Sequence, residues 1–239
     1  MSALHRFFVG PATLQGDAAR LEGDQARQVA AVLRLGPGDR VILVRDGVEH
    51  EAELERVSPG EVTGTVRARR ECAAEPRLRL ALALPLLRGD RGEEVVEAVT
   101  QLGVSSIVPF WSARSVAREL SPARRERWQR IARESAETAR RGRVPEIADA
   151  VGWADLLRAL QPPVLVAWEG ERATHLADAF DRRAPGASLV IGPEGGLSSD
   201  EVALARARGA RTVSLGERNL RSETAAVAAV AIVFALARG

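Results

Sequence analysis

Two glycine-containing segments near the carboxyl end of the chain carry residue types from which a ligand-binding site can be built. Residues 191–196 (IGPEGG) follow the apolar run 189–191, and residues 214–225 (SLGERNLRSETA) overlap the end of the β-branched run 212–215. Each segment leads into a helix-like pattern, and strand-to-helix loops at the carboxyl ends of parallel strands are where open α/β sheets bind ligands. The spacing therefore predicts neighbouring strands that line one pocket.

The first loop has a composition that suits some ligands better than others. Its glycines allow left-handed backbone conformations and close approach of a ligand. Glu194 would repel a phosphate, which phosphate-binding glycine loops meet with bare N–H groups and a cation. A neutral, hydroxyl-bearing or cationic ligand fits better, and S-adenosylmethionine, with its ribose and sulfonium, is such a ligand. A tight turn with one exposed glutamate explains the loop equally well. Ser198 and Glu201 have the spacing of a capping box that opens the next helix.

The second loop contains Asn219, the only asparagine in the chain, between Arg218 and Arg221. Its amide could hydrogen-bond a ligand, or the residue could simply tolerate a left-handed turn. Ser222 is expected to cap the following helix, and Glu223 lies near the positive end of that helix. The loop therefore has both a chemical and a structural interpretation.

Together the two segments resemble a family signature. IGPEGGLSSDE (191–201) and SLGERNLRSETAAV (214–227) are similar to the motifs of the bacterial 16S ribosomal RNA uridine-N3 methyltransferases, members of the SPOUT superfamily of knotted methyltransferases. Asn219 departs from the pattern, which often has an apolar residue there. The resemblance implies methyl transfer from S-adenosylmethionine to N3 of a uridine in 16S rRNA, within the 30S subunit, by a homodimer. Another SPOUT-type methylation, such as at the ribose 2′-hydroxyl, and a non-enzymatic RNA-binding module are the alternatives.

The resemblance also implies roles for individual residues. Arg221 is expected to orient the base or stabilise the anion that develops at N3, and Glu223, or a water that it holds, is a candidate proton acceptor. Stabilisation of the helix N-terminus is the structural alternative for Glu223. The residues expected to hold the cofactor are Trp168, Glu169, Ile191, Gly192, Pro193, Glu194, Gly195, Gly196, Leu215, Gly216, Asn219 and Leu220.

Residues 1–70 have the pattern of a small, mostly β domain. Short β-like runs joined by tight turns, one of them at 46–47, favour a compact barrel. A short helix in this region is expected to have an apolar side made by Val29, Val32 and Leu33. In the family that the motifs resemble, this region is a PUA-like domain that holds RNA.

Residues 71–77 look like a linker, and from 78 to 239 strands alternate with helices. Apolar strands between helices predict an α/β domain with a parallel sheet covered on both faces. No G-x-G-x-x-G follows the first strand, so a nicotinamide-binding Rossmann site is not expected. The final helix, 223–237, is apolar nearly all round and should be buried on every side. A trefoil knot and a role of this helix in a dimer follow only from the resemblance to SPOUT proteins.

The basic residues, 34 in all, are without exception arginine, a side chain that forks onto phosphate and stacks on bases. Residues 114–143 carry ten Arg against four Glu, and a helix is expected over 121–142. This segment is predicted to contact RNA phosphates, although a solvated helix face with ion pairs explains part of the pattern. The candidate RNA-binding residues are Arg6, Arg34, Arg69, Arg70, Arg114, Arg140, Arg141 and Arg143.

The overall composition excludes several classes of protein. The formal net charge is only +2, although the calculated isoelectric point is 9.7. The single cysteine, Cys72, excludes an internal disulfide framework and is typical of the reducing cytosol. No apolar run is long enough to cross a bilayer, and the three scattered histidines do not indicate a metal site. We therefore expect a cytoplasmic protein without a metal.

Overall fold

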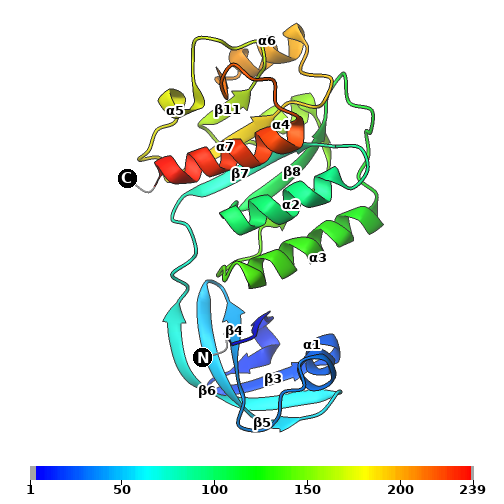
Figure 1. The fold of residues 1–239 in the computed structure, drawn as a ribbon, viewed down its shortest axis with the longest axis vertical. Helices are drawn as coiled ribbons and strands as arrows, with labels where there is room; N and C mark the ends of the chain where they lie inside the picture. The colour runs from blue at the N-terminus through cyan, green and yellow to red at the C-terminus, as the bar shows by residue number, and fades with distance from the viewer. Residues whose placement is uncertain (1–3, 238–239) are drawn as a thin grey trace. The chain divides into compact units, whose positions relative to one another are not determined.

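The computed structural model describes residues 4–237, which divide into two compact units. The first unit contains the chain up to Glu75 together with Ala136–Val144, and the second contains Pro76–Ser135 and the chain from Pro145 onward (Figure 1). The sequence pattern places residues 136–144 in the second domain. In the structure they belong to the first.

Residues 136–144 join the first unit through apolar packing and an ion pair. Ala136 packs against buried apolar residues of the first sheet. Arg141 donates a hydrogen bond to Glu75 at 2.7 Å. The first unit is therefore assembled from two separate stretches of sequence.

The first unit is built around a six-stranded, curled sheet (Figure 1). Its order is β1-β4-β5-β6-β3-β2, and neighbours are antiparallel except for the parallel pair β1 and β4. In β6, Val62, Gly64 and Val66 are buried and alternate with less buried residues, the period-two pattern of a half-buried strand. The elements are β1 (Arg6–Phe8), η1 (Pro11–Thr13), β2 (Leu14–Gln15), β3 (Ala18–Glu22), α1 (Gly23–Arg27), η2 (Gln28–Val32), β4 (Arg40–Arg45), β5 (Val48–Val57) and β6 (Glu61–Glu71).

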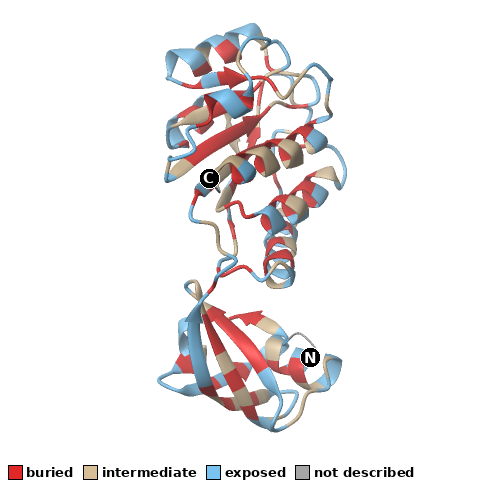
Figure 2. Cartoon of the chain, turned by 60° about the vertical axis from the view of Figure 1, so that its left-hand side comes forward, coloured by how far each residue is buried: buried red, intermediate tan, exposed pale blue. Residues whose placement is uncertain are grey.

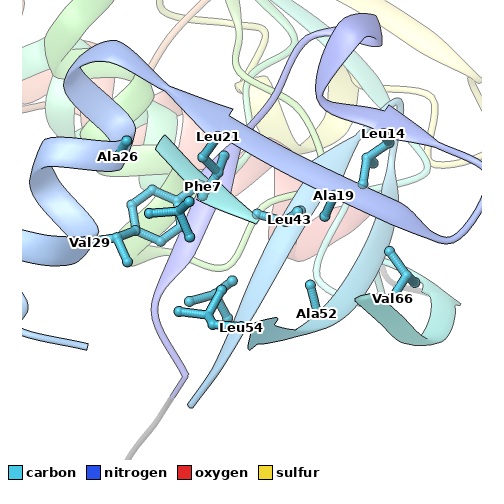
Figure 3. Packing of buried hydrophobic residues seen from close by; sticks show 12 residues of the cluster. Phe7, Leu14, Ala19, Leu21, Ala26, Val29, Leu43, Ala52, Leu54 and Val66 are labelled. Carbon is cyan, nitrogen blue, oxygen red and sulfur yellow. The ribbon is translucent and has the colours of Figure 1, made fainter. Parts of the chain in front are cut away.

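The core of the first unit collects apolar side chains from the strands and the short helical segment. Phe7 and Leu43 are buried there with Val29 (Figure 3). Val32, expected on the same apolar side, is 69% exposed, because η2 winds as a π-helix whose wider turn moves it to another face. The prediction of a mostly β domain is confirmed.

The second unit contains a seven-stranded sheet in which every pairing is parallel. Its order is β10-β8-β7-β12-β11-β13, and β9 also pairs with β8. The central strands are almost entirely buried (Figure 2), as expected of strands covered on both faces. The predicted parallel sheet is confirmed. Its strands are β7 (Arg79–Pro85), β8 (Ser106–Trp111), β9 (Glu146–Ile147), β10 (Val151–Gly152), β11 (Val164–Ala167), β12 (Gly186–Ile191) and β13 (Arg211–Val213).

Helices cover both faces of this sheet. α2 and α7 pack together over one face (Figure 1), and α4 and α6 pack together over the other. α3 approaches α2 closely, where Trp128 of α3 lies against Gly92 of α2. The helices are α2 (Arg91–Leu102), α3 (Pro122–Thr138), α4 (Trp153–Ala159), α5 (Leu176–Ala179), α6 (Ser199–Ala207) and α7 (Ser222–Leu236).

Several elements depart from the sequence expectations. α3 stops at Thr138, and Arg140 adopts a left-handed φ of 57°. The strands β9 and β10 are not predicted, because two residues leave no periodicity to read, and the short helix α4 is not predicted either. α7 is buried on one face only, and Val227 and Ile232 are half-buried on the other, so the expectation of burial on every side is wrong for the single chain. None of the helices in residues 4–237 is both long and apolar enough to cross a membrane.

Candidate functional site

A cavity of about 750 Å³ opens at the carboxyl ends of three strands in the second unit. β11 ends at Ala167, β12 at Ile191 and β13 at Val213, and β11 lies between the other two. The two glycine-containing loops therefore border one cavity, as predicted, although their strands are not direct neighbours. Every residue predicted to bind a cofactor lies on its wall.

A hydrogen bond joins the two loops. The buried hydroxyl of Ser222 donates to the carbonyl oxygen of Gly192 at 2.8 Å. The prediction that Ser222 caps α7 is wrong, because Arg221 occupies the N-cap position and Ser222 uses its hydroxyl to hold the other loop. The capping box of α6 is confirmed, since Ser198 and Glu201 each accept a hydrogen bond from the backbone N–H of the other.

The first glycine loop is packed against side chains that follow other strands. Gly196 has a φ of +70°, which strains any other residue, and a Cβ there would also displace Oε1 of Glu169, 2.2 Å away, so glycine is favoured. Arg114 donates from Nη1 to the carbonyl oxygen of Gly195 at 3.1 Å. Because Glu169 follows β11 and Arg114 follows β8, segments from separate strands fix the shape of this loop.

The cavity carries charges of both signs. Glu194 forms an ion pair with Arg91, at the start of α2, so its negative charge is partly neutralised. Arg172 and Arg218 also line the cavity. Sequence reasoning misses Arg91, although its place just after the first strand of the sheet could have indicated it. Among the residues that the structure describes, no group of three or more His, Cys, Asp or Glu side chains is arranged to hold a metal ion.

The loop after β11 is held by Glu171, which the sequence does not single out. One oxygen of its carboxylate accepts from the hydroxyl of Thr212 at 2.6 Å and from Arg206 at 3.2 Å, and the other accepts from the backbone N–H groups of residues 172–174. The hydrogen bond from Thr212, followed by those from the backbone N–H groups, lowers the pKa of Glu171 to about 2. Arg206 also lies over the ring of Trp168, 5.4 Å from its centroid. The network orders the segment that begins at Trp168.

The two predicted catalytic residues are placed differently. Arg221 lines the cavity, and its side chain is 78% exposed. Glu223, in the first turn of α7, is not among the lining residues. Its Oε1 lies 4.0 Å from Nη1 of Arg221, and its buried Oε2 has no hydrogen-bond partner among the described residues. The structure therefore places Arg221 on the wall of the cavity and Glu223 in the adjoining first turn of α7, outside the lining.

Two of the predicted RNA-binding arginines are buried. The side chain of Arg6 is 9% exposed and donates to Glu49 at 2.6 Å, and that of Arg141 is 2% exposed and pairs with Glu75 at 2.7 Å. Their guanidinium groups are committed inside the first unit, so the prediction that they contact phosphate is wrong. The other predicted arginines are exposed, namely Arg34, Arg69, Arg70, Arg114, Arg140 and Arg143.

Comparisons with known proteins agree over nearly the whole chain. A family model described as an RNA methyltransferase domain matches residues 74–234. The ribosomal RNA small subunit methyltransferase E of Bacillus subtilis (strain 168) is 32% identical over 245 aligned positions, covering 96% of both chains.

Two solved structures have the same fold. A putative methyltransferase from Legionella pneumophila, in complex with the bound cofactor SAM, is 27% identical with a TM-score of 0.87 over 98% of each chain. A ribosomal RNA small subunit methyltransferase E from Neisseria gonorrhoeae, bound to S-adenosyl methionine, is 28% identical with a TM-score of 0.86 over 96% of each chain.

A match of this length to the domain model places the molecule in the class of RNA methyltransferases. The near-complete alignment with a relative of that class narrows the assignment. The chain belongs to the ribosomal RNA small subunit methyltransferase E family. The resemblance inferred from the two loop motifs is thereby confirmed, as is the expectation of an enzyme.

Proposed function

We propose that this chain uses S-adenosylmethionine to methylate N3 of a uridine in 16S ribosomal RNA. The observation that carries the proposal is the single cavity on which both glycine-containing loops meet. The chain aligns almost end to end with two proteins whose structures contain this cofactor. The names of the relatives support ribosomal RNA as the substrate, and the choice of uridine N3 follows from the family that the motifs resemble.

The residues around the cavity fit S-adenosylmethionine. A volume of about 750 Å³ lies within the range of small-molecule pockets, roughly 300–1,000 Å³. Ile191, Leu215 and Leu220 offer apolar surface for a flat ring, and the backbone of the two loops offers hydrogen-bonding groups for hydroxyl and amino groups. Glu169 contributes a carboxylate that favours a nearby sulfonium or ammonium. Exposed Arg172 would meet the carboxylate of the ligand.

The chemistry assigns distinct tasks to the protein. S-adenosylmethionine supplies an electrophilic methyl group when bound. Uracil N3 carries a proton at neutral pH, so the protein must help to remove that proton and stabilise the resulting negative charge. We assign orientation of the base and stabilisation of the developing anion to Arg221, whose exposed guanidinium lines the cavity.

Glu223 is assigned as the proton acceptor, directly or through a water. Its Oε2 is without a hydrogen-bond partner among the described residues, so the atom has capacity to accept one. Its alternative role is stabilisation of the positive end of α7, in whose first turn it lies.

RNA contact and assembly complete the proposal. Exposed arginines would contact phosphates and position the RNA; they are Arg34, Arg69, Arg70, Arg114, Arg140 and Arg143. The half-exposed apolar face of α7 would pack against a second copy of the chain to form a homodimer. A PUA-like barrel and a trefoil knot are proposed from the resemblance to SPOUT proteins alone. The substrate would be the 30S particle, which implies a cytoplasmic enzyme.

The test is mass spectrometry of nucleosides from 16S rRNA, after 30S particles that lack the modification are incubated with the protein and S-adenosylmethionine. We expect new 3-methyluridine. A 2′-O-methylated nucleoside instead would contradict the N3 assignment while keeping the methyltransferase activity. Cofactor binding without any methylated product would exclude 16S rRNA in this particle as the substrate.

A further inference from the structure

A second cavity, of about 400 Å³, is formed entirely by residues of the first unit. Its walls are largely apolar and include Leu4, Ile42, Ala73 and Ala74. The volume lies within the range of small-molecule pockets, roughly 300–1,000 Å³. Three arginines and two glutamates complete the lining, so one positive charge is in excess; they are Arg6, Arg70, Arg140, Glu49 and Glu71.

An ion network centred on the buried Glu49 forms one wall of this cavity. Glu49 accepts from Arg6 through Oε1 and from Arg70 through Oε2, each at 2.6 Å. Burial alone would raise the pKa of Glu49, but the hydrogen bonds and charges of the two arginines outweigh it and hold the pKa below 4.5. Glu49 therefore stays ionised and fixes both guanidinium groups. The side chain of Arg6 is more than nine-tenths buried, and its Nε has no partner among the described residues.

The rim of the cavity carries the excess positive charge. Arg70 and Arg140 are exposed, and Arg140 forms no ion pair within the part of the chain that the structure describes. The backbone of Arg140 is held in place, because its carbonyl oxygen accepts from the thiol of Cys72 at 3.0 Å. The fold thus presents two cations beside an apolar recess.

We propose that this cavity takes the base of one unpaired nucleotide of the RNA substrate, with a neighbouring phosphate on Arg140 and Arg70. The apolar walls suit the faces of a base, and the exposed carboxylate of Glu71 offers an acceptor for its edge. Proteins commonly read single-stranded RNA through such splayed-out bases, while phosphate contacts fix the register. The inference rests on the proposed function for the identity of the ligand as RNA.

The test compares RNA affinity in the full-length protein by fluorescence anisotropy with a labelled single-stranded 16S fragment. Ala73→Trp fills the recess from an exposed position, removes the apolar burial of the base and should weaken binding about tenfold. Arg140→Gln should also weaken binding, whereas Arg67→Gln, which removes an equal charge from an exposed position of β6 outside the cavity, should not. Calorimetry with S-adenosylmethionine and the melting temperature should be unchanged in all three variants.

Removal of single bases from the fragment identifies the occupant. One abasic position should weaken binding to the wild type about tenfold and have no further effect in Ala73→Trp. Equal affinities of Ala73→Trp and the wild type, or equal losses from Arg140→Gln and Arg67→Gln, would overturn the inference. If RNA binding does not depend on the cavity but the wild type still produces 3-methyluridine, the inference fails and the proposed function stands. If cavity-dependent RNA binding occurs without methylation, the inference stands and the proposed function fails.

Discussion

Arg221 and Arg218 lie in the same loop before α7 and both line the larger cavity. Replacing Arg221 by alanine should lower the methylation rate about 10²-fold, since removal of one group that stabilises a developing anion has roughly this effect. Affinity for S-adenosylmethionine should change little. Single-turnover methylation and calorimetry measure the two quantities separately.

Arg218→Ala is the matched control, because it removes the same charge from the same loop. We expect it to retain most of the methylation rate. If Arg221→Ala loses rate and cofactor affinity equally, or if both variants lose rate equally, Arg221 does not act in the methyl-transfer step.

Glu171 gives the stability of the second unit a pH dependence whose sign is known. The hydroxyl of Thr212 and neighbouring backbone N–H groups lower its pKa from 4.5 to about 2. A carboxyl with a lowered folded-state pKa contributes stability that is fully present above its unfolded pKa and is lost as pH falls through the folded value. Glu171→Gln should therefore melt at a lower temperature than the wild type at pH 7, and the difference should shrink between about pH 4.5 and 2.

Thermal unfolding at stepped pH measures this difference. Glu217→Gln, which removes an exposed carboxylate of the same unit, should melt like the wild type at every pH. A difference between Glu171→Gln and the wild type that stays constant down to pH 2 would contradict the assigned origin of the stabilisation.

At the scale of single residues, the sequence predicts which residues line the cavity better than it predicts whether a side chain is buried or exposed. Loop motifs are enough to predict a set of residues that line one cavity, because glycines and their neighbours are local signals. Arg6 and Arg141 look like their exposed neighbours in the sequence, and only long-range partners, Glu49 and Glu75, show that they are buried. Glu171 is not predicted for the same reason, since its partner Thr212 lies on β13, distant in the sequence.

At the scale of elements, the contact between α2 and α3 depends on one missing side chain. A Cβ at Gly92 would lie 2.5 Å from the ring of Trp128, which is fully buried and has little room to move. Alanine is favoured over glycine in a helix by about 1 kcal/mol. Here overpacking should dominate, and Gly92→Ala should lower the free energy of unfolding by about 1–3 kcal/mol.

Chemical denaturation measures the change, with Gly60→Ala as the control. A Cβ at Gly60 would have no atom within 4 Å, so this variant should keep wild-type stability. If Gly92→Ala is as stable as the wild type, α2 and α3 can move apart enough to fit the added Cβ without lowering the free energy of unfolding.

Long periodic elements could be predicted and short ones could not. The parallel strands and the helices α2 and α6 follow from apolar runs and caps. β9 and β10 have two residues each, too few for any period. The apolar composition of α7 predicts that the helix is buried but not which surface covers it. Packing within one chain and packing between copies of the chain require the same side chains.

For the whole molecule, the half-exposed apolar face of α7 predicts the oligomeric state. Val227, Ala228, Ala231 and Ile232 lie on this face and are only half-buried. We expect a dimer in sedimentation velocity, and a monomer for Ala231→Glu, because a carboxylate buried there without a partner is costly. Ala203→Glu, on the exposed side of α6, should leave the dimer intact, and a monomeric wild type would refute the assignment.

The division of the first unit into two stretches sets an order of events during synthesis. Its strands are all translated within the first 75 residues, but Ala136–Val144 emerge only after a large part of the second unit. Until then Phe8, Ile42 and Val44 lack Ala136 and Val144, the apolar side chains that pack on them. The growing chain therefore passes through a stage in which this strip is open to chaperones, and a module exchange between relatives would have to transfer both stretches together.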